Sequence, residues 1–400
     1  MEMKELVIKY KDYVQELRRE FHQHPELSYE EVETTKRIAA ELDKMKIPYQ
    51  INPEKNTGIV AVIKGDHPGK AVGLRADIDA LNVKEKNTFS FASKVDGKMH
   101  ACGHDGHMAI LLGAARMLLH MRDEIHGTVY LIFQPAEEVG SGASYMMRFG
   151  DWYKKIDNIF GAHVWIDLKA GQVSVEAGPR LAAADSFKIK VIGQSGHGSQ
   201  PQQTIDATLV ASAIVMNLQS IVSRHYSPLH SVVVTVGSLH SGNRFNIISG
   251  IAEMEGTCRY FDTEVANDID KIMKQIIENT AAAYGAKAEL DYDFMLPATI
   301  NEESSSRIAI NSVKTVLGKQ AVTTMIKTMG GEDFAFYLQN KPGCFAMIGI
   351  CNPEIGANYS HHNEHFNMDD SVLSGGSGVY AQYAIDYLKN NRDDANKGVK

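Results

Sequence analysis

The chain has 400 residues, of which 44% are hydrophobic and 22% charged, as in ordinary globular proteins. A chain of this length exceeds one small core, so we expect two domains. The formal net charge of −8 argues against nucleic acid or an anionic membrane as the main partner, and we expect neither.

Compartment and membrane signals point to a cytoplasmic protein. The N-terminal stretch MEMKELVIKYKDYVQELRRE is charged throughout and lacks the apolar core of a signal peptide. The longest apolar segment, MAILLGAARMLLHM, is interrupted by Arg116 and is too short to cross a bilayer. The four cysteines are too few and too scattered for a disulfide framework: Cys102, Cys258, Cys344 and Cys351.

Helix and strand patterns alternate over the first part of the chain. Ser28 and Glu31 have the spacing of a capping box, which predicts a helix from Ser28 to about Lys46. A second helical pattern covers about 108–121. Buried strands are predicted at 58–63, 71–75, 127–133 and 158–164. This alternation predicts an α/β layered domain.

The pattern changes after residue 184. Strands are predicted at 187–193, 231–240, 251–261 and 288–294, with helices at 205–224 and 263–284, the latter closed by Gly285. The order βαββαβ is the split ferredoxin-like unit. Helices near 306–317, 333–338 and after 371, and a strand at 344–350, then restore the α/β pattern. We therefore predict an α/β catalytic domain at 1–184 and 299–400, interrupted by an inserted α+β domain at 185–298.

The stretch HACGHDGHMA places Cys102 and His104 two residues apart. A thiolate and an imidazole at this spacing can bind one metal ion or two neighbouring ions, and Gly103 allows a tight bend. The motif is weak by itself, because the chain has 16 histidines and four cysteines. The alternative is a buried cysteine near a surface histidine.

The stretch FQPAEEVGSGA places Glu137 and Glu138 just after a predicted strand. Metal-assisted hydrolysis needs one carboxylate to bind the ion and another to take a proton from water. The alternative is a solvated acidic helix start. His163 ends another predicted strand, where a lone histidine is usually hydrogen-bonded and inert. The late cluster, in which a surface position is the alternative, contains His361, His362 and His365.

The position of these residues along the predicted sheet connects them. In an open α/β sheet, ligands bind outside the carboxyl ends of the strands. Mixed sulfur, nitrogen and oxygen donors suit zinc or a similar transition ion rather than magnesium or calcium. The candidates at this edge are Asp77, Asp79, Cys102, His104, Glu137, Glu138, His163 and His362.

The inserted domain offers candidates for substrate contact. His197, in GQSGHGSQPQ, lies on a glycine-flanked loop and is expected to bind a developing oxyanion, with a flexible surface loop as the alternative. Asn246, in GNRFN, and Arg259 are candidate anchors for a substrate carboxylate. Gly331, in MGGEDF, belongs to a segment expected to face the same cleft.

These motifs, in this order, make the chain resemble the dizinc amidohydrolases of the hippurate hydrolase and auxin-conjugate (indole-acetyl-amino-acid) hydrolase type. That group is part of the aminoacylase and carboxypeptidase superfamily sometimes called metallopeptidase family twenty. The resemblance covers nearly the whole chain. Its motifs are RREFHQHPELSYEE, GLRADIDAL, HACGHDGHMA, FQPAEEVGSGA, GAHVW, GHGSQP, GTCRYF, GGEDFAF and HHNEHF.

The resemblance implies a zinc-exopeptidase-like catalytic domain with a ferredoxin-like lid that commonly serves dimerisation, and hence a homodimer. It implies that Glu137 is the general base and that His197 helps to bind the substrate carbonyl. The two divalent ions it implies are zinc, manganese, cobalt or nickel, and their ligands would be Cys102, His104, Glu138, His163 and His362. We expect three carboxylates to support these ligands: Asp77, Asp79 and Asp105.

We therefore predict a metal-dependent amidohydrolase acting on N-acyl or N-aroyl amino acids or related small conjugates. The alternatives are a metallo-dipeptidase or carboxypeptidase, which usually has aspartate in place of Cys102, and a catalytically silent metal-binding scaffold. Two stretches near the expected lid depart from the family pattern, and they bear on substrate identity: Gln200-Pro201-Gln202 and Ile248-Ser249-Gly250.

Overall fold

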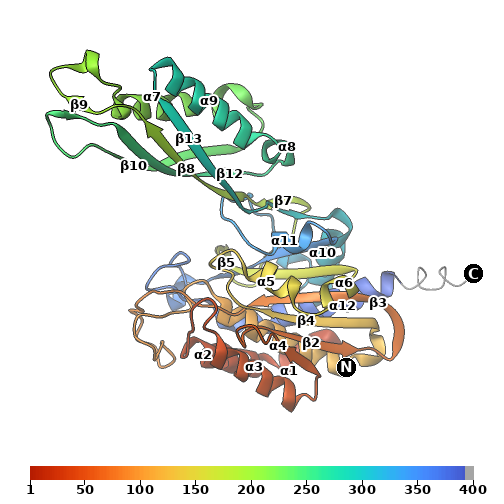
Figure 1. The fold of residues 1–400 in the computed structure, drawn as a ribbon. Coiled ribbons are helices and arrows are strands. Elements are labelled where there is room, and N and C mark those ends of the chain that lie inside the picture. Colours follow the sequence, from red (N-terminus) through yellow and green to blue (C-terminus); the bar gives the residue numbers. More distant parts are fainter. Residues whose placement is uncertain (392–400) are drawn as a thin grey trace, which may run out of the picture. The chain divides into compact units, whose positions relative to one another are not determined.

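The computed structural model describes residues 1–391, which form two compact units (Figure 1). The first unit contains Met1–Arg180, Ile300–Ile326 and the described chain from Asp333 onward. The second unit contains Leu181–Thr299 and the short segment Lys327–Glu332.

The division departs from the predicted insert, 185–298, at the segment Lys327–Glu332. This segment joins the second unit through backbone hydrogen bonds. The N–H of Ala182 donates to the carbonyls of Thr328 and Gly330, and Leu181 bridges to Thr328. Pairing between residues so distant in the chain leaves no local sequence pattern, so the prediction missed it.

A seven-stranded sheet forms the centre of the first unit, in the order β1-β2-β4-β3-β5-β15-β6. The inner strands β4, β3, β5 and β15 run parallel, whereas β1, β2 and β6 pair antiparallel at the margins. The inner strands are buried on both faces, which explains their continuous apolar runs. The strands are β1 (Tyr49–Ile51), β2 (Ile59–Lys64), β3 (His67–Asp77), β4 (His126–Gln134), β5 (Asn158–Lys169), β6 (Val173–Ser174) and β15 (Gly343–Cys351).

Helices cover both faces of this sheet (Figure 1). The helix α4 is buried on nearly every side because it lies between the sheet and its neighbours α2 and α12. Its sequence is accordingly apolar all round rather than amphipathic. The helices of this unit are α1 (Met3–Lys9), α2 (Lys11–His22), α3 (Val32–Lys44), α4 (His104–His120), α5 (Gly142–Arg148), α6 (Trp152–Lys155), α10 (Glu303–Leu317), α11 (Ala335–Leu338) and α12 (Leu373–Asn390).

The predicted capping box at Ser28 and Glu31 is wrong. The helix α3 begins at Val32, and neither side chain caps it. Glu26 does so instead: its Oε2 accepts a hydrogen bond from the Thr34 N–H at 2.7 Å and its Oε1 accepts one from the Glu33 N–H at 3.2 Å. The spacing was suitable for a cap, but both side chains are engaged elsewhere in the fold.

The second unit is a four-stranded antiparallel sheet, in the order β10-β12-β8-β13, with α7 and α9 packed together against it. The chain order βαββαβ agrees with the predicted split ferredoxin-like unit. The predicted helix 263–284 is two helices, and the predicted helix 205–224 ends in a π-helical turn, Ile221–His225. The main elements are β8 (Ala183–Ile192), α7 (Ala207–Ser220), β10 (Val232–Ser241), β12 (Ile251–Tyr260), α8 (Thr263–Ala266), α9 (Ile269–Ala283) and β13 (Lys287–Leu296).

Two short two-stranded sheets remain. The strands β9 (Gly196–His197) and β11 (Ile247–Ile248) pair within the second unit. The strands β7 (Gly178–Leu181) and β14 (Thr299–Asn301) pair where the chain passes between the two units. The stretch Ala207–His225 is long and apolar enough to cross a membrane by length and composition, and 33% of it is buried. Core helices of soluble proteins pass the same test, so composition alone does not assign this helix to a membrane.

Candidate metal centre

Cys102 and His104 reach the site through a tight bend at the start of α4. Gly103 has a φ of +93°, and a Cβ at this position would lie 2.4 Å from the Cγ2 atom of Val164. Only glycine therefore permits both the left-handed backbone and the close approach of this bend to β5. The result is that the Cys102 thiol and the first side chain of α4 lie beside His163.

His163 lies inside β5 rather than at its end, which corrects the prediction. The strand continues to Lys169 because β15 pairs along it beyond His163. The pairing of β3 with β5, however, ends at Arg75 and Gly161. His163 thus lies two residues past the last β5 residue that pairs with β3. This position is at the carboxyl ends of the parallel strands, where ligands bind in open α/β sheets.

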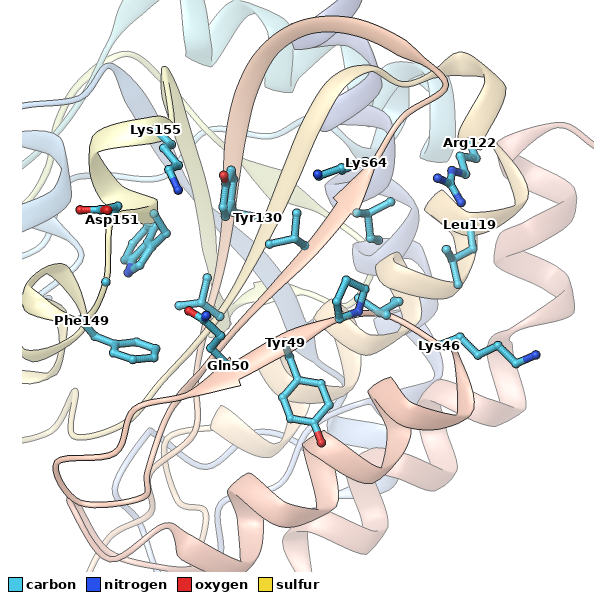
Figure 2. Close-up of a pocket in the computed structure, with 17 residues that line it drawn as sticks. Lys46, Tyr49, Gln50, Lys64, Leu119, Arg122, Tyr130, Phe149, Asp151 and Lys155 are labelled. Atoms are coloured by element: carbon cyan, nitrogen blue, oxygen red, sulfur yellow. The ribbon is translucent and has the colours of Figure 1, made fainter.

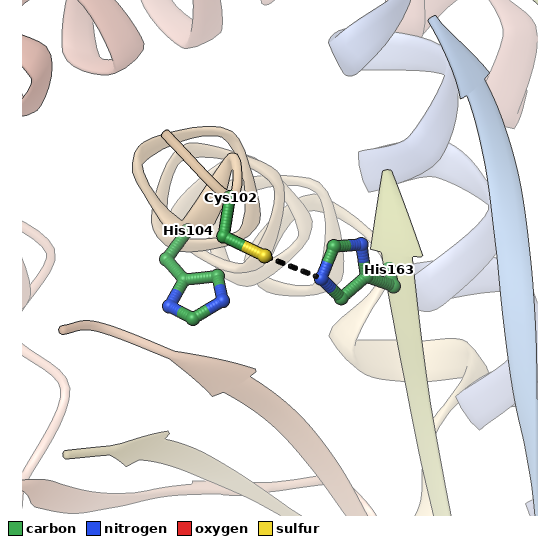
Figure 3. A group of neighbouring side chains, drawn as sticks. All are labelled: Cys102, His104 and His163. Atoms are coloured by element: carbon green, nitrogen blue, oxygen red, sulfur yellow. Dashed lines mark hydrogen bonds between the residues drawn. The ribbon is translucent and has the colours of Figure 1, made fainter. Parts of the chain in front are cut away.

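Four predicted ligand side chains meet around the sulfur of Cys102. The Sγ atom lies 3.4 Å from Nε2 of His163 (Figure 3) and 3.3 Å from Nε2 of His362. Nε2 of His362 lies 3.5 Å from Oε1 of Glu138. Bond lengths of 2.0–2.3 Å in a tetrahedral zinc site place ligand atoms about 3.4 Å apart. The donor atoms therefore have the spacing of metal ligands.

His104 and Glu138 each present a buried atom that suits a metal ion. The Nδ1 of His104 contacts the carbonyl oxygen of Asp79 at 2.9 Å and its Oδ1 at 3.2 Å, so the Nε2 atom is left for another partner. Among the described residues, neither this Nε2 atom nor Oε1 of Glu138 has a hydrogen-bond partner. The two atoms lie 3.9 Å apart. A bound cation would satisfy both of them.

The donors fall into two groups that share Cys102. One group is Cys102, His104 and His163, and the other is Cys102, Glu138 and His362; the donor atoms of each lie within 4.8 Å of one another. Because the same sulfur belongs to both groups, Cys102 would contribute to the binding of two ions. Sulfur, imidazole and carboxylate donors together suit zinc-like transition ions.

Asp77 supports the site from beneath. It is fully buried, contacts Nδ1 of His107 at short range and accepts a 2.7 Å hydrogen bond from Arg75. Burial raises its pKa, but the neighbouring His104, His107 and Arg75 together hold the pKa of Asp77 well below its usual range. Nε2 of His107 in turn accepts a 2.8 Å hydrogen bond from the Val164 N–H. Asp77 and His107 therefore fix the backbone beside His163.

The protonation of the ligands follows from burial and from these carboxylates. Burial raises the pKa of the Cys102 thiol well above its usual value, and Glu138 adds to the effect. Burial lowers the pKa of His163 well below its usual value. Burial opposes protonation of His104 too, but Asp77 and Asp79 hold its pKa well above the usual range. Metal binding releases such protons, so affinity at this site depends on pH.

Asp105 does not support the ligands as predicted. Its Oδ2 lies 2.9 Å from Nε of Arg18 and 2.8 Å from Nδ1 of His22, and all three side chains are fully buried. The Asp105 carboxylate therefore links α4 to α2 through ion pairs. In the first turn of α4 this side chain points toward α2 rather than toward the metal centre. A local motif does not reveal which face of the helix each residue takes.

The choice between the adjacent His361 and His362 is decided by the fold. His362 has a φ of +65° and points its Nε2 atom at Cys102. His361 instead stacks near the rings of Trp165 and Phe366, and its Nε2 accepts a hydrogen bond from the Ile166 N–H at 3.3 Å. His361 therefore packs against Trp165 and Phe366, whereas His362 belongs to the donor group with Cys102 and Glu138.

Glu137 lies beside His104 and Glu138 and is partly exposed to solvent. Its carboxylate forms a group with His104 and Glu138 within 4.8 Å, and its Oε1 accepts a long, 3.4 Å hydrogen bond from the Asp333 N–H. The carboxylate is partly exposed. It is thus placed to exchange a proton with a molecule at the site.

Four predicted substrate contacts belong to the second unit. His197 is exposed on β9, and its Nδ1 accepts a 3.1 Å hydrogen bond from the Ser199 N–H, which leaves Nε2 as the donor atom of the neutral ring. The exposed Asn246 accepts a 2.9 Å hydrogen bond from Gly198 through its carbonyl. Arg259 is half-buried, and its Nη1 lies 3.5 Å from the position a Cβ would take at Gly331.

The sequence analysis missed a support for the Glu137–Glu138 loop. Ser28 and Glu31, assigned there to a helix cap, contact Asp79 and Ala136 instead. The signal was present, because PELSYEE was one of the motifs of the family resemblance and had no role in the predicted chemistry.

Comparison with known proteins gives a consistent result. Residues 73–386 match the sequence profile described as Peptidase family M20/M25/M40. The chain is 40% identical over 373 residues to N-acetylcysteine deacetylase of Bacillus subtilis, covering 93% of this chain and 96% of that one. It is 40% identical over 381 residues to IAA-amino acid hydrolase ILR1-like 4 of Arabidopsis thaliana, covering 94% and 86%.

A solved structure extends the comparison to the fold. The YXEP protein of Bacillus subtilis, described as a dinuclear metal binding peptidase from the M20 family, superposes with a TM-score of 0.85. It is 35% identical, and the match covers 96% of this chain and 99% of that one.

Proposed function

Because the chain belongs to peptidase family M20/M25/M40, and the proteins it resembles include an N-acetylcysteine deacetylase, an IAA-amino acid hydrolase and a dinuclear metal binding peptidase, we propose that it cleaves the amide bond of N-acyl or N-aroyl amino acids or related small conjugates. The observation that carries this proposal is the sulfur of Cys102, which belongs to two donor groups, with the Glu137 carboxylate beside His104 and Glu138 but in neither Cys102 group. Such a set has donors for two ions and a neighbouring carboxylate for proton transfer.

The residues present fit two divalent ions, which we propose to be zinc, manganese, cobalt or nickel. Cys102, His104, Glu138, His163 and His362 would hold them. Ions bound there supply Lewis acidity for the scissile carbonyl and lower the pKa of water. Asp79 keeps the Nδ1 proton of His104 on the side away from the site, so that Nε2 is the coordinating atom.

Proton transfer is assigned to Glu137. Its partly exposed carboxylate takes a proton from the attacking water and delivers it to the departing amine nitrogen. Asp333, through its backbone N–H, holds one carboxylate oxygen and so limits the rotation of the side chain. Replacement of Glu137 should leave metal binding intact, because Glu137 belongs to neither of the donor groups that contain Cys102.

Substrate recognition is assigned to the second unit. The Nε2–H of His197 donates to the developing oxyanion, because its Nδ1 is already engaged by Ser199. Arg259 binds the substrate carboxylate, with Gly331 beside it. Asn246 lies next to Gly198 on the ribbon that carries His197, near the other end of β12, and is assigned to the same substrate. The departures at Gln200, Gln202, Ser249 and Gly250 from the family pattern lie nearby in the chain and bear on which acyl group and amino acid are preferred.

The test is a substrate panel on metal-loaded protein, with release of free amine as the readout. Hippurate, N-acetylcysteine and indole-3-acetyl amino acids represent the proposed class. Dipeptides and carboxypeptidase substrates represent the alternative activity. Faster cleavage of the first set supports the proposal, whereas exclusive cleavage of free dipeptides overturns it in favour of the peptidase.

We also propose a homodimer formed through the second unit. The inner side of α7 packs in the core of that unit, while its outer side leaves Leu209 and Met216 exposed by 54% and 72%, and Val222 in the π-helical turn that follows is exposed by 37%. The strand β10 lies at the edge of the sheet, with unpaired backbone groups. Light scattering after gel filtration tests this, with Met216→Glu expected to shift the protein to monomer.

The proposed location is the cytoplasm. All four cysteines are free, and a thiolate ligand such as Cys102 is preserved by a reducing compartment. Fractionation of cells with an antibody to the chain tests this, and recovery in a secreted or membrane fraction would contradict it.

A further inference from the structure

The first inference concerns the segment Ser28–Glu31, which contacts the loop that carries Glu137 and Glu138. Ser28 Oγ donates a 2.7 Å hydrogen bond to Oδ2 of Asp79, and the same oxygen accepts one from the Glu138 N–H at 3.1 Å. Oε1 of Glu31 accepts a 2.9 Å hydrogen bond from the Ala136 N–H. The segment thus holds both sides of the loop by its backbone.

Ala136 is the strained point of this loop. Its φ is +58°, in the left-handed region that non-glycine residues seldom adopt. Such conformations persist only where the surroundings determine them, and they cluster at functional sites. The residue immediately precedes Glu137, so its backbone angles set the direction in which both glutamates leave the loop.

Glu31 is a buried acid whose carboxylate faces backbone N–H groups, that of Ala136 among them. It is 0% exposed, and its Oε2 has no hydrogen-bond partner among the described residues. Burial raises its pKa to about 8, and Asp79 adds to the effect. An uncharged carboxyl in this place resembles an amide, so glutamine should be able to take over the contact.

We propose that Glu31 is a positioning residue that fixes the Ala136 backbone and thereby aims Glu137 and Glu138. The inference rests on the proposed roles of those two glutamates. The hydrogen bond from Ala136, rather than a charge, is what the loop requires. Loss of the acceptor should let the loop relax away from the strained conformation.

The test compares Glu31→Ala with Glu31→Gln, which retains the acceptor, and with Glu26→Ala. The Glu26 variant loses the cap of α3 on Thr34 but touches nothing in the loop. Displacing catalytic groups by about 1 Å costs about 100-fold in rate, so Glu31→Ala should lower kcat by about 10- to 100-fold with KM within about twofold. Glu31→Gln should stay within about threefold of wild type, and Glu26→Ala should lower only the melting temperature.

Metal binding gives a readout independent of turnover. Calorimetric titration of Zn²⁺ into chelator-treated protein should show weaker binding for Glu31→Ala, because Glu138 is misplaced, and near-normal binding for Glu31→Gln. This arm still tests the inference if no substrate in the panel is cleaved. If Glu31→Ala does not fold, Glu31→Asp, whose carboxylate is one methylene shorter, should give the same loss. Unchanged kcat and metal affinity in a folded Glu31→Ala protein overturn the inference.

A second, independent observation is a cavity of about 630 Å³ in the first unit (Figure 2). This volume lies within the range of small-molecule sites, about 300–1,000 Å³. It lies over β1, β2 and β4, beside α6, and none of the proposed metal ligands lines it. It is therefore distinct from the metal centre.

The floor and one wall of the cavity are apolar and aromatic. Val62 and Tyr130 are paired across β2 and β4, and Val60 follows the same face of β2 two residues away. Phe149 and Trp152 form the wall beside α6. Flat rings and branched side chains of this kind suit a planar apolar body.

The rim carries four basic side chains and one acidic side chain, although the chain has a net charge of −8: Lys46, Lys64, Arg122 and Lys155 against Asp151. Arg122 pairs with Asp66 at 3.2 Å. Within the described residues, no carboxylate lies within ion-pair distance of Lys46, Lys64 or Lys155. In Figure 2 the Tyr130 ring stands between the Lys155 and Lys64 side chains. The local charge is opposite to that of the whole molecule, which favours an anionic ligand.

We infer that this cavity binds a small amphipathic anion, with a planar apolar body against the half-buried Tyr130 and Phe149 and a carboxylate or sulfonate facing the rim lysines Lys64 and Lys155. The chain offers its own reporter, because it contains only two tryptophans. In a Trp165→Phe background, Trp152 in the cavity wall is the single donor for energy transfer.

The probe is 8-anilinonaphthalene-1-sulfonate, and its uncharged counterpart is N-phenyl-1-naphthylamine. Reversing the charge of the rim with Lys64→Glu and Lys155→Glu should lower the affinity for the sulfonate probe by about tenfold. The affinity for the neutral amine should change by no more than about twofold. The matched control reverses two exposed lysines away from the cavity, Lys4→Glu and Lys94→Glu, and should change neither.

Two results bear on the identity of this site. Chelator-treated protein should bind the sulfonate as well as untreated protein, because no metal ligand contributes. Benzoate should displace the probe and benzyl alcohol should not. Equal sulfonate affinity in the rim variant and the control variant, or binding that disappears with the metal, overturns the inference.

Discussion

The Sγ atom of Cys102 and the Nε2 atom of His362 lie 3.3 Å apart, although 260 positions separate them in the chain. The contact joins the start of α4 to the loop after β15. It also places the sulfur in a second donor group, beside the one it forms with His104 and His163. The properties of the metal centre should therefore depend on Cys102 more than on any single histidine.

Cys102→Ala should lower the metal content, measured by mass spectrometry of the purified protein, from two ions per chain to one or fewer. The reason is that both donor groups lose the same atom. Cys351→Ala is the matched control, because Cys351 is also a free, partly exposed cysteine but belongs to no donor group among the described residues. Unchanged stoichiometry in Cys102→Ala would make the thiol structural.

Glu137→Gln should retain its metal and lose about 10²- to 10⁴-fold in kcat, since the amide cannot take a proton from water. Glu138→Gln should instead lose metal, because its buried Oε1 lies beside Nε2 of His362 and of His104 and has no hydrogen-bond partner in the described chain. The pair is measured by metal analysis and steady-state kinetics on the same samples. Near-normal turnover in Glu137→Gln would remove this residue from the base role.

His362→Ala and His361→Ala should have different effects although the residues are neighbours. The first should lower metal affinity, because its Nε2 atom faces Cys102 and Glu138. The second should keep the metal and lower the free energy of unfolding by about 1–3 kcal/mol, because His361 packs on Trp165 and Phe366. Metal titration and urea unfolding measure the two effects, and a reversed pattern contradicts the assignment of the ligand.

His197→Ala should cut kcat by about 10²- to 10³-fold, as expected for loss of a hydrogen bond to an oxyanion. Affinity for a substrate analogue should change little, because the contact strengthens only in the transition state. Ser199→Ala is a milder control, since the backbone N–H still engages Nδ1 of His197. An effect confined to KM would indicate a simple substrate contact.

The stability of the second unit should depend on the ionisation of Asp185. Burial raises its pKa, and the hydroxyls of Tyr260 and Tyr292, which donate at 2.6 and 2.8 Å, only partly oppose the shift. A raised pKa means that the folded state prefers the protonated form. This contribution is therefore complete below the unfolded value, about 3.9, and is lost as the pH rises through the folded pKa.

The Asp185→Asn variant cannot ionise at this position. It should therefore not show the decrease in the free energy of unfolding that ionisation of Asp185 causes as the pH rises. Its free energy of unfolding, relative to wild type, should increase between pH 4 and pH 7. Urea unfolding of both proteins at several pH values, with Asn in place of the nearby exposed Asp293 as control, measures the difference. A constant difference across this range would show that Asp185 keeps an ordinary pKa.

Much of the fold and of the candidate site was predictable from local patterns. The alternation of apolar runs located most strands to within a few residues, because buried parallel strands are apolar on both faces. The pair Glu137–Glu138 and the spacing of Cys102 and His104 were visible because coordination chemistry requires particular residue types close together. Their family order then indicated the reaction.

Other features depended on contacts between distant segments. Ser28 and Glu31 have the spacing of a helix cap, but the fold brings Asp79 and Ala136 within hydrogen-bond reach first. The segment Lys327–Glu332 joins the second unit only because Ala182 donates to its carbonyls. The contacts of Ala136 and Ala182 involve backbone groups, which are the same in every residue and so leave no mark in a sequence. The contact of Ser28 with Asp79 joins side chains that are 51 positions apart.

The sequence by itself therefore determined which kinds of donor atoms the protein possesses and in what order they occur along the chain. Only the tertiary structure decided which of them meet, because distance in space is independent of distance in the chain. The family resemblance had already chosen His362 over His361, and the fold placed it against Cys102, turned Asp105 toward Arg18, and put the Cys102 sulfur in two donor groups. Side-chain direction depends on backbone angles, such as the positive φ of Gly103 and Ala136, that packing between distant segments imposes.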